Sequence, residues 1–163
     1  MAMKRLSSGK NSEPIRKTTV VCVTNQFQCE RIIRAGRSIA GISDTELLVV
    51  NVSPLDFTHQ SSDALEHLFQ VSKENGAQMS VLYSEESMKT LISFIRKNHA
   101  VNVVTGMPQS RNSILVKMWE KLKEVSFFTV DEDGKFVNMS QQYARGKGTL
   151  LHPNAPKMNH EIA

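Results

Sequence analysis

Thr18-Thr19-Val20-Val21-Cys22-Val23-Thr24 is the stretch of sequence that decides the fold, and Asn25 follows it at once. Its β-branched and apolar residues predict a strand that is buried on both faces, while Thr24 and Asn25 suit the turn that ends it. Residues 26–40 then bring apolar side chains to one face at helical spacing, and Gly41 is expected to stop this helix. The arginines of the helix, Arg31 among them, are expected on its solvated face.

The same alternation continues to residue 130. Further strands are predicted at 46–52, 78–83, 101–105 and 126–130, with helices at 63–75, 85–98 and 114–124. Continuous runs of Val, Ile and Leu are typical of strands that helices cover on both faces of a parallel sheet. We therefore expect one α/β domain built on a five-stranded parallel sheet, with helices on both faces. Residues 135–138 could add an irregular edge strand to these five, and the sequence does not decide whether they do.

Residues 17–138 have the composition of a folded domain, and the two ends of the chain do not. Residues 1–16 are polar without a hydrophobic period, so we expect a flexible leader; residues 139–163 are rich in Gly, Gln, Asn, Pro and Lys, so we expect a loose tail. No apolar run approaches the roughly 20 residues that a membrane span needs, and the basic start lacks the apolar stretch of a secretory signal. We expect no membrane contact and a cytoplasmic location.

The basic character of the chain is confined to its ends. The formal net charge is +4, but residues 18–138 hold twelve basic and fourteen acidic side chains. A folded body without an excess of basic residues argues against sequence-specific nucleic-acid binding. The two cysteines, Cys22 and Cys29, have neither the number nor the spacing of a zinc site or a disulfide framework.

The carboxyl ends of the predicted strands are where a ligand is expected, because an open parallel sheet binds ligands where its strand order reverses. The loop after the fourth strand is the most informative of these ends. Gly106 lets the backbone approach a ligand, and the following helix offers free N–H groups to an anion. Ser110, Arg111 and Ser113 add side-chain donors. A phosphate site is one interpretation; the other is that the serines cap the helix and Arg111 is solvated. The residues alone leave both open.

Residues suited to catalysis or metal binding are few. The sequence holds no P-loop, no Gly-x-Ser-x-Gly turn, no His-Glu-x-x-His pair and no Gly-x-Gly-x-x-Gly turn. His59 and His67 are eight apart and have no Cys or carboxylate partner at ligand spacing. We therefore expect no metal site, no catalytic residue and no enzymatic activity.

Two adjacent stretches permit a comparison with a known family. Val21-Cys22-Val23-Thr24, followed by Cys29-Glu30-Arg31-Ile32-Ile33-Arg34-Ala35-Gly36-Arg37, is similar to the universal-stress-like cytoplasmic domain of bacterial potassium-sensing histidine kinases. Together with the alternating strands and helices and the glycine-led loop, they make residues 18–130 resemble a universal stress protein. The resemblance implies the adenine nucleotide alpha hydrolase-like fold (HUP type), whose right-handed crossovers give the strand order 3-2-1-4-5. It also implies a homodimer through residues 126–130. The sequence of this expected edge strand is apolar and uncharged, and proteins usually protect such an edge from solvent.

The resemblance to ATP-binding universal stress proteins is incomplete. Those members carry Gly-x-x-Gly-x9-Gly-Ser/Thr after the fourth strand, and Gly106 matches the first position. Gln109 stands at the second glycine and Trp119 at the third, where we expect their side chains to obstruct a phosphate, and Thr24 replaces the usual acidic residue after the first strand. The adenine contact that the resemblance implies at Val52 is retained. We therefore expect weak ATP binding at most, and no hydrolysis.

Three functions are weighed. The first is a non-enzymatic, nucleotide-responsive signalling or stress module that binds an adenine nucleotide or a cyclic dinucleotide weakly; ATP, AMP and cyclic di-AMP are the candidate ligands, and a sensor kinase is the candidate partner. The alternative is a ligand-free dimerisation or docking domain that has lost the ATP site. An adenylate-forming enzyme of the ATP-pyrophosphatase fold is disfavoured, because residues 24–28 lack the Ser-Gly-Gly-x-Asp-Ser loop of those enzymes. The candidate nucleotide-binding residues are Thr24, Asn25, Val52, Gly106, Ser110, Arg111 and Ser113.

Overall fold

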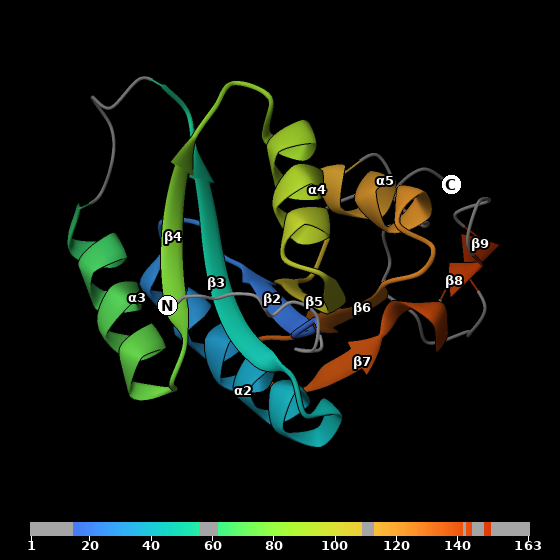
Figure 1. Ribbon diagram of the computed structural model, residues 1–163, viewed down its shortest axis with the longest axis horizontal. Helices are drawn as coiled ribbons and strands as arrows, with labels where there is room; N and C mark the ends of the chain where they lie inside the picture. The colour runs from blue at the N-terminus through green and yellow to red at the C-terminus, as the bar shows by residue number, and fades with distance from the viewer. Residues whose placement is uncertain (1–14, 56–61, 109–112, 142, 145–148, 151–163) are drawn as a thin grey trace, which may run out of the picture.

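The centre of the molecule is a six-stranded sheet (Figure 1). The computed structural model describes residues 15–55, 62–108, 113–141, 143–144 and 149–150. The strands stand in the order β4-β3-β2-β5-β6-β7, and every neighbouring pair is parallel except β6 and β7. Their bounds are β2 (Thr18–Cys22), β3 (Glu46–Ser53), β4 (Gln78–Tyr83), β5 (Ala100–Gly106), β6 (Ser126–Val130) and β7 (Phe136–Asn138).

The five predicted strands are present, parallel and in the predicted order, but the predicted number of strands is wrong. Residues Phe136–Asn138 add β7, which pairs antiparallel with β6. The turn before β7 explains this pairing. Asp131 Oδ1 accepts the backbone N–H groups of Asp133 and Lys135 at 2.9 Å each, and Gly134 has a φ of 84°. A tight hairpin therefore returns the chain beside β6.

Strand β6 is an interior strand, so the expectation that residues 126–130 form an exposed edge is wrong. β5 pairs with one side of β6 and β7 pairs with the other. Backbone pairing between two copies through residues 126–130 would require β7 to move away. The homodimer itself stays a prediction.

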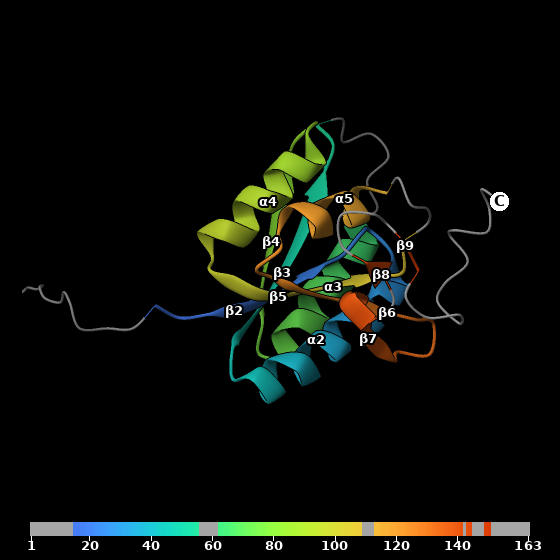
Figure 2. The same cartoon turned by 90° about the vertical axis from the view of Figure 1, so that its right-hand side faces the viewer.

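Two pairs of helices cover the two faces of the sheet, as predicted (Figure 2). Successive strand residues point to opposite faces. Val21 accordingly packs into the core under α2 and α3, and Val20 packs into the core under α4 and α5. The helices are α2 (Glu30–Ser43) and α3 (Ser62–Glu74) on one face, and α4 (Ser87–Lys97) and α5 (Ile114–Lys121) on the other. None of the helices in the described part of the chain is long and apolar enough to cross a membrane.

The first helix begins and ends later than predicted. A 3₁₀ turn, η1 (Phe27–Cys29), follows β2, and α2 begins only after it. The helix then passes through Gly41 and ends at Ser43, because Asp44 takes the left-handed conformation with a φ of 56°. Gly41 is therefore not the residue that stops the helix.

The fold continues past residue 138, the predicted end of the domain. The 3₁₀ turn η2 (Met139–Gln141) follows β7, and Met139 is fully buried in the core under α4 and α5. Two short strands, β8 (Tyr143–Ala144) and β9 (Thr149–Leu150), pair antiparallel. The loose tail therefore does not begin at residue 139. Residues 1–14 and 151–163, which hold most of the predicted leader and tail, lie outside the described residues.

Helix α2 approaches the sheet closely at Gly36. A methyl group at this position would stand 2.3 Å from Cγ2 of Val21 and 3.2 Å from Cδ1 of Leu47. Val21 belongs to β2 and Leu47 to β3, and both are buried. Only glycine therefore fits without a shift of the helix or of these two buried side chains.

We expect Gly36→Ala to lower the free energy of unfolding by about 1–3 kcal/mol through overpacking, although alanine is intrinsically the better helix former by about 1 kcal/mol. Gly41→Ala is the matched control, because Gly41 lies in the same helix and has no neighbouring atom within 4 Å of the added methyl group. We expect this control to gain about 0.5–1 kcal/mol. Urea unfolding of both variants measures the difference, and a gain in both would contradict the close approach.

Candidate functional site

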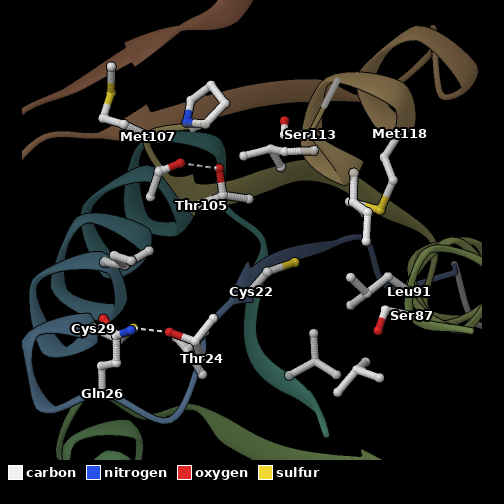
Figure 3. A pocket seen from close by; sticks show the side chains of 18 of the residues that line it. Cys22, Thr24, Gln26, Cys29, Ser87, Leu91, Thr105, Met107, Ser113 and Met118 are labelled. Atoms are coloured by element: carbon white, nitrogen blue, oxygen red, sulfur yellow. Dashed lines mark hydrogen bonds between the residues drawn. The ribbon is translucent and has the colours of Figure 1, made fainter. Parts of the chain in front are cut away.

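The strand order reverses beside β2. The chain passes from β2 to β3 and β4 on one side, and then returns to β5 and β6 on the other. The helices that follow β2 and β5 consequently lie on opposite faces of the sheet, which opens a crevice at the carboxyl ends of these strands. A pocket with a volume of about 810 Å³ lies at this place (Figure 3). The predicted position of the site, the carboxyl edge at the reversal, thus coincides with a cavity.

One side of the pocket is apolar. Cys22 of β2, Val52 of β3, Leu91 of α4 and Met118 of α5 line it. Figure 3 shows Leu91 and Met118 across the pocket from Thr24. Because these side chains carry no charge, this side suits a flat, weakly polar group such as a nucleobase.

The turn after β2 is held by Asn51 of β3. Its Nδ2 donates to the carbonyl oxygen of Val23 and to Oδ1 of Asn25, both at 2.9 Å, and its Oδ1 accepts a hydrogen bond from Ser53 at 2.6 Å. Asn51 and Ser53 are buried. Asn25 is engaged in this network and is not among the residues that line the pocket, so its role in this structure is to fix the turn.

Four of the seven predicted site residues meet at the pocket, namely Thr24, Val52, Gly106 and Ser113. Thr24 Oγ1 lies 3.4 Å from Cys29 Sγ in a hydrogen bond. Ser113 is the N-cap of α5, and its Oγ accepts the N–H of Val116 at 3.2 Å. The capping role that the sequence left open for Ser113 is thus confirmed, beside its place in the lining. Ser110 and Arg111 lie outside the described residues.

Arg31 lines the pocket, although the sequence indicated a solvated helix face. Its Nε donates to the carbonyl oxygen of Asp131 at 2.8 Å, and its Nη1 donates to the carbonyl oxygen of Gln28 at 2.7 Å. Its Nη2 would lie 4.0 Å from a methyl group placed on Gly106. Its position in the first turn of the helix after β2, at the carboxyl edge, is the signal from which the sequence could have identified it. The partner Asp131, a hundred residues later, gives no such signal.

Glu132, in the turn between β6 and β7, is a second lining residue that the sequence analysis missed. It is exposed, and it follows the residue whose carbonyl group holds Arg31. Among the described residues that line the pocket, Arg31 and Glu132 are the two that carry charge. The described lining is therefore close to neutral overall.

Trp119 does not obstruct the pocket, so the predicted clash at this position is wrong. Its side chain is fully buried in the core under α4 and α5, together with Ile95 and Phe127. It points to the sheet and is not among the lining residues. Gln109, the other predicted obstruction, lies outside the described residues.

The chemistry that the pocket offers is limited. Cys22 is partly buried in the pocket wall, and the loss of solvent around its thiol raises the pKa from 9.0 to about 12, so this thiol is protonated and weakly nucleophilic at neutral pH. Within the described ranges, no group of three His, Cys, Asp or Glu side chains could hold a metal ion. The described residues of the pocket offer a ligand hydrogen bonds, one cation and an apolar surface.

Comparison with known proteins establishes the fold. No protein-family model matches the sequence, and no curated protein matches it. Among solved structures, the universal stress protein from Archaeoglobus fulgidus is 21% identical at a TM-score of 0.52, over 66% of this chain and 88% of its own. A universal stress protein in complex with cAMP is 16% identical at a TM-score of 0.44, over 58% of this chain and 75% of its own. The Archaeoglobus fulgidus protein in complex with dAMP is 18% identical at a TM-score of 0.44, over 58% of this chain and 83% of its own. The likeness to the first of these structures shows that the chain has the fold of a universal stress protein, while the likeness to sensor-kinase domains stays a prediction.

The raised pKa of Cys22 leads to a prediction about its reactivity. At pH 8.5 we expect iodoacetamide to modify Cys22 at least about a hundredfold more slowly in the folded chain than in the urea-unfolded chain, because the thiolate is the nucleophile. Peptide mass mapping separates Cys22 from Cys29 within one sample. A folded-state rate within tenfold of the unfolded one would show that the thiol is not held in its protonated form.

The same pKa shift links Cys22 to stability at high pH. The folded chain holds the thiol proton more tightly than the unfolded chain, so this contribution to stability is complete below pH 9.0 and is lost as the pH rises toward about 12. We therefore expect Cys22→Ala to lose less stability than the parent chain between these two values. Chemical unfolding at several alkaline pH values measures how the free energy of unfolding of each chain changes with pH. The same pH dependence in both chains would contradict the raised pKa of Cys22.

Proposed function

We propose that this chain is a non-enzymatic, nucleotide-responsive module that binds an adenine nucleotide in the pocket at the carboxyl edge of its sheet. The observation that carries the proposal is the meeting of Thr24, Val52, Gly106 and Ser113, from four separate segments, around one cavity. The volume of about 810 Å³ falls within the range of small-molecule sites, about 300–1,000 Å³.

The base is assigned to the apolar side of the pocket. Val52 near the end of β3 and Cys22 of β2 form one wall, and Leu91 and Met118 stand opposite Thr24. The Cys22 thiol is protonated at neutral pH, so this wall carries no charge next to the base. Burial of a flat ring against these side chains would supply most of the binding free energy through the hydrophobic effect.

The phosphate is assigned to the end of β5. Gly106 has no side chain, so a ligand can reach the backbone there, and the first turn of α5 offers N–H groups that the helix itself does not use. β3 and β5 flank β2, so their ends lie two strand spacings apart, about 10 Å. This separation suits a nucleoside monophosphate with its base at Val52 and its phosphate at Gly106.

Binding is proposed to be weak and without turnover. Hydrolysis of ATP requires groups that neutralise the transferred phosphoryl group, normally a metal ion and a placed cation. The described lining offers Arg31 alone as a cation, and Ser113 Oγ already accepts a hydrogen bond within α5. In line with the resemblance, the proposed role is cytoplasmic stress or signalling, as a homodimer and beside a sensor kinase.

A ligand-free dimerisation or docking domain is the second candidate function. One position of the ATP motif of universal stress proteins favours it, because Gln109 replaces a glycine. Such a domain would keep the pocket as a remnant of the fold and would act through its surface. Titration of the chain with nucleotides distinguishes the two functions.

Isothermal titration of the full chain with AMP, ATP with magnesium, and cyclic di-AMP tests the proposed function, followed by a phosphate-release assay. We expect saturable binding of at least one ligand, an ATP affinity weaker than low micromolar, and no steady release of phosphate. Ligand at a hundred times its dissociation constant should also add about 2.7 kcal/mol to the free energy of unfolding. Low-micromolar ATP binding with turnover would overturn the non-enzymatic assignment, and no binding of any ligand would favour the docking domain.

Glycine variants locate the binding site within the chain. A methyl group at Gly106 would stand 3.4 Å from Ile32, an ordinary contact, so Gly106→Ala should fold normally. We expect Gly106→Ala to weaken AMP binding and Gly106→Val to weaken it further, because each added atom stands where the phosphate meets the backbone. Gly41→Ala is the control, since Gly41 is exposed on α2 and does not line the pocket. Equal affinities for all of these variants would place the ligand elsewhere.

A further inference from the structure

We propose that Arg31 holds the phosphate of the ligand and that Glu132 disfavours further phosphate groups, so that the pocket prefers nucleoside monophosphates to triphosphates. This inference rests on the proposed function and assigns roles to two residues that are not among the seven predicted site residues. It follows from the way Arg31 is fixed and from the order of the strand ends along the sheet edge.

Arg31 is held in position before any ligand arrives. Two of its three guanidinium nitrogen atoms donate to backbone carbonyl groups, Nε to Asp131 at 2.8 Å and Nη1 to Gln28 at 2.7 Å. The third nitrogen, Nη2, would lie 4.0 Å from a methyl group on Gly106. A phosphate at the end of β5 therefore meets a cation whose side-chain entropy is already lost, which makes the contact stronger than one to a free surface arginine.

The strand order sets the direction in which a longer ligand would extend. The carboxyl ends of the parallel strands follow one another in the order β3, β2, β5 and β6. With the base at Val52 on β3 and the first phosphate at Gly106 on β5, further phosphates extend toward the end of β6. The chain after β6 continues as Asp131-Glu132-Asp133, and Glu132 lines the pocket. A second and third phosphate therefore approach a carboxylate.

The charges of the described lining support one phosphate and oppose three. Arg31 is its single cation and Glu132 its single anion. Lys135, the basic residue of the same turn, is exposed and is not among the lining residues. One phosphate pairs with Arg31, whereas each further phosphate adds negative charge beside Glu132 without a matching cation among these residues.

Titration of the full chain with adenosine, AMP and ATP tests this proposal. Adenosine reports on the base site alone, and the gain from adenosine to AMP reports on the phosphate contact. We expect Arg31→Gln to weaken AMP binding about tenfold and to leave adenosine binding within about twofold, because a charged hydrogen bond is lost. Arg37→Gln is the matched control, since Arg37 is exposed on the same helix and does not line the pocket. Arg31→Lys keeps the charge but loses the two backbone hydrogen bonds that fix the guanidinium group, and it should give an intermediate loss for AMP.

Glu132 is tested by the ratio of the ATP and AMP affinities. We expect Glu132→Gln to raise the affinity for ATP about threefold more than that for AMP, as expected from the loss of one repulsive charge in a solvated site. Asp133→Asn is the control on the same turn, because Asp133 is exposed and does not line the pocket. An unchanged ratio in Glu132→Gln would overturn the role of Glu132.

The outcomes separate this inference from the proposed function. If adenosine binds but Arg31→Gln affects AMP no more than Arg37→Gln does, the role of Arg31 is wrong and the nucleotide site stands. If Arg111→Gln abolishes the gain from adenosine to AMP while Arg31→Gln preserves it, the phosphate belongs to Arg111 instead. If neither adenosine nor AMP binds the parent chain up to millimolar concentration, the proposed function fails and this inference fails with it. Unchanged adenosine binding in Arg31→Gln shows that the variant is folded.

Discussion

The absence of a side chain at Gly36 is the constraint on which the rest of the structure depends. It allows α2 to rest directly on Val21 and Leu47, so the helix lies close over β2 and β3. The first turn of the helix then reaches the carboxyl end of β2, where Arg31 can donate to the carbonyl group of Asp131 on the far side of the reversal point. The packing of one helix thereby sets the position of a charged group in the pocket.

The sequence was sufficient for the parallel sheet, because each of its five strands is a run of β-branched and apolar residues bounded by turn residues. The sequence was insufficient where two nearby residues could each adopt the conformation that ends a helix. Glycine is the commonest residue in the left-handed conformation at a helix end, yet Asp44 takes it here and Gly41 remains helical. Strand β7 is only three residues long and depends on the turn at Asp131, so the sequence could suggest an edge strand at residues 135–138 but could not decide whether it forms.

The candidate site was predictable to the extent that it follows from backbone topology. The rule that places ligands at the carboxyl ends of strands selected Thr24, Val52 and Gly106, which line the pocket. The direction of a side chain was not predictable in the same way. Trp119 turns into the core and Asn25 bonds to Asn51, because packing and hydrogen bonding decided both orientations.

The pocket is built from both ends of the folded chain, with Thr24 on one wall and Glu132 on another. Separation of the β6–β7 hairpin or of α5 would therefore dismantle it, and a partly folded chain would not have the site. A ligand in the pocket would bind only the completely folded chain. Its binding free energy would therefore oppose proteolysis as well as denaturation. The lifetime of the protein in a cell would then rise with the concentration of its ligand, and abundance itself would become a readout of that concentration.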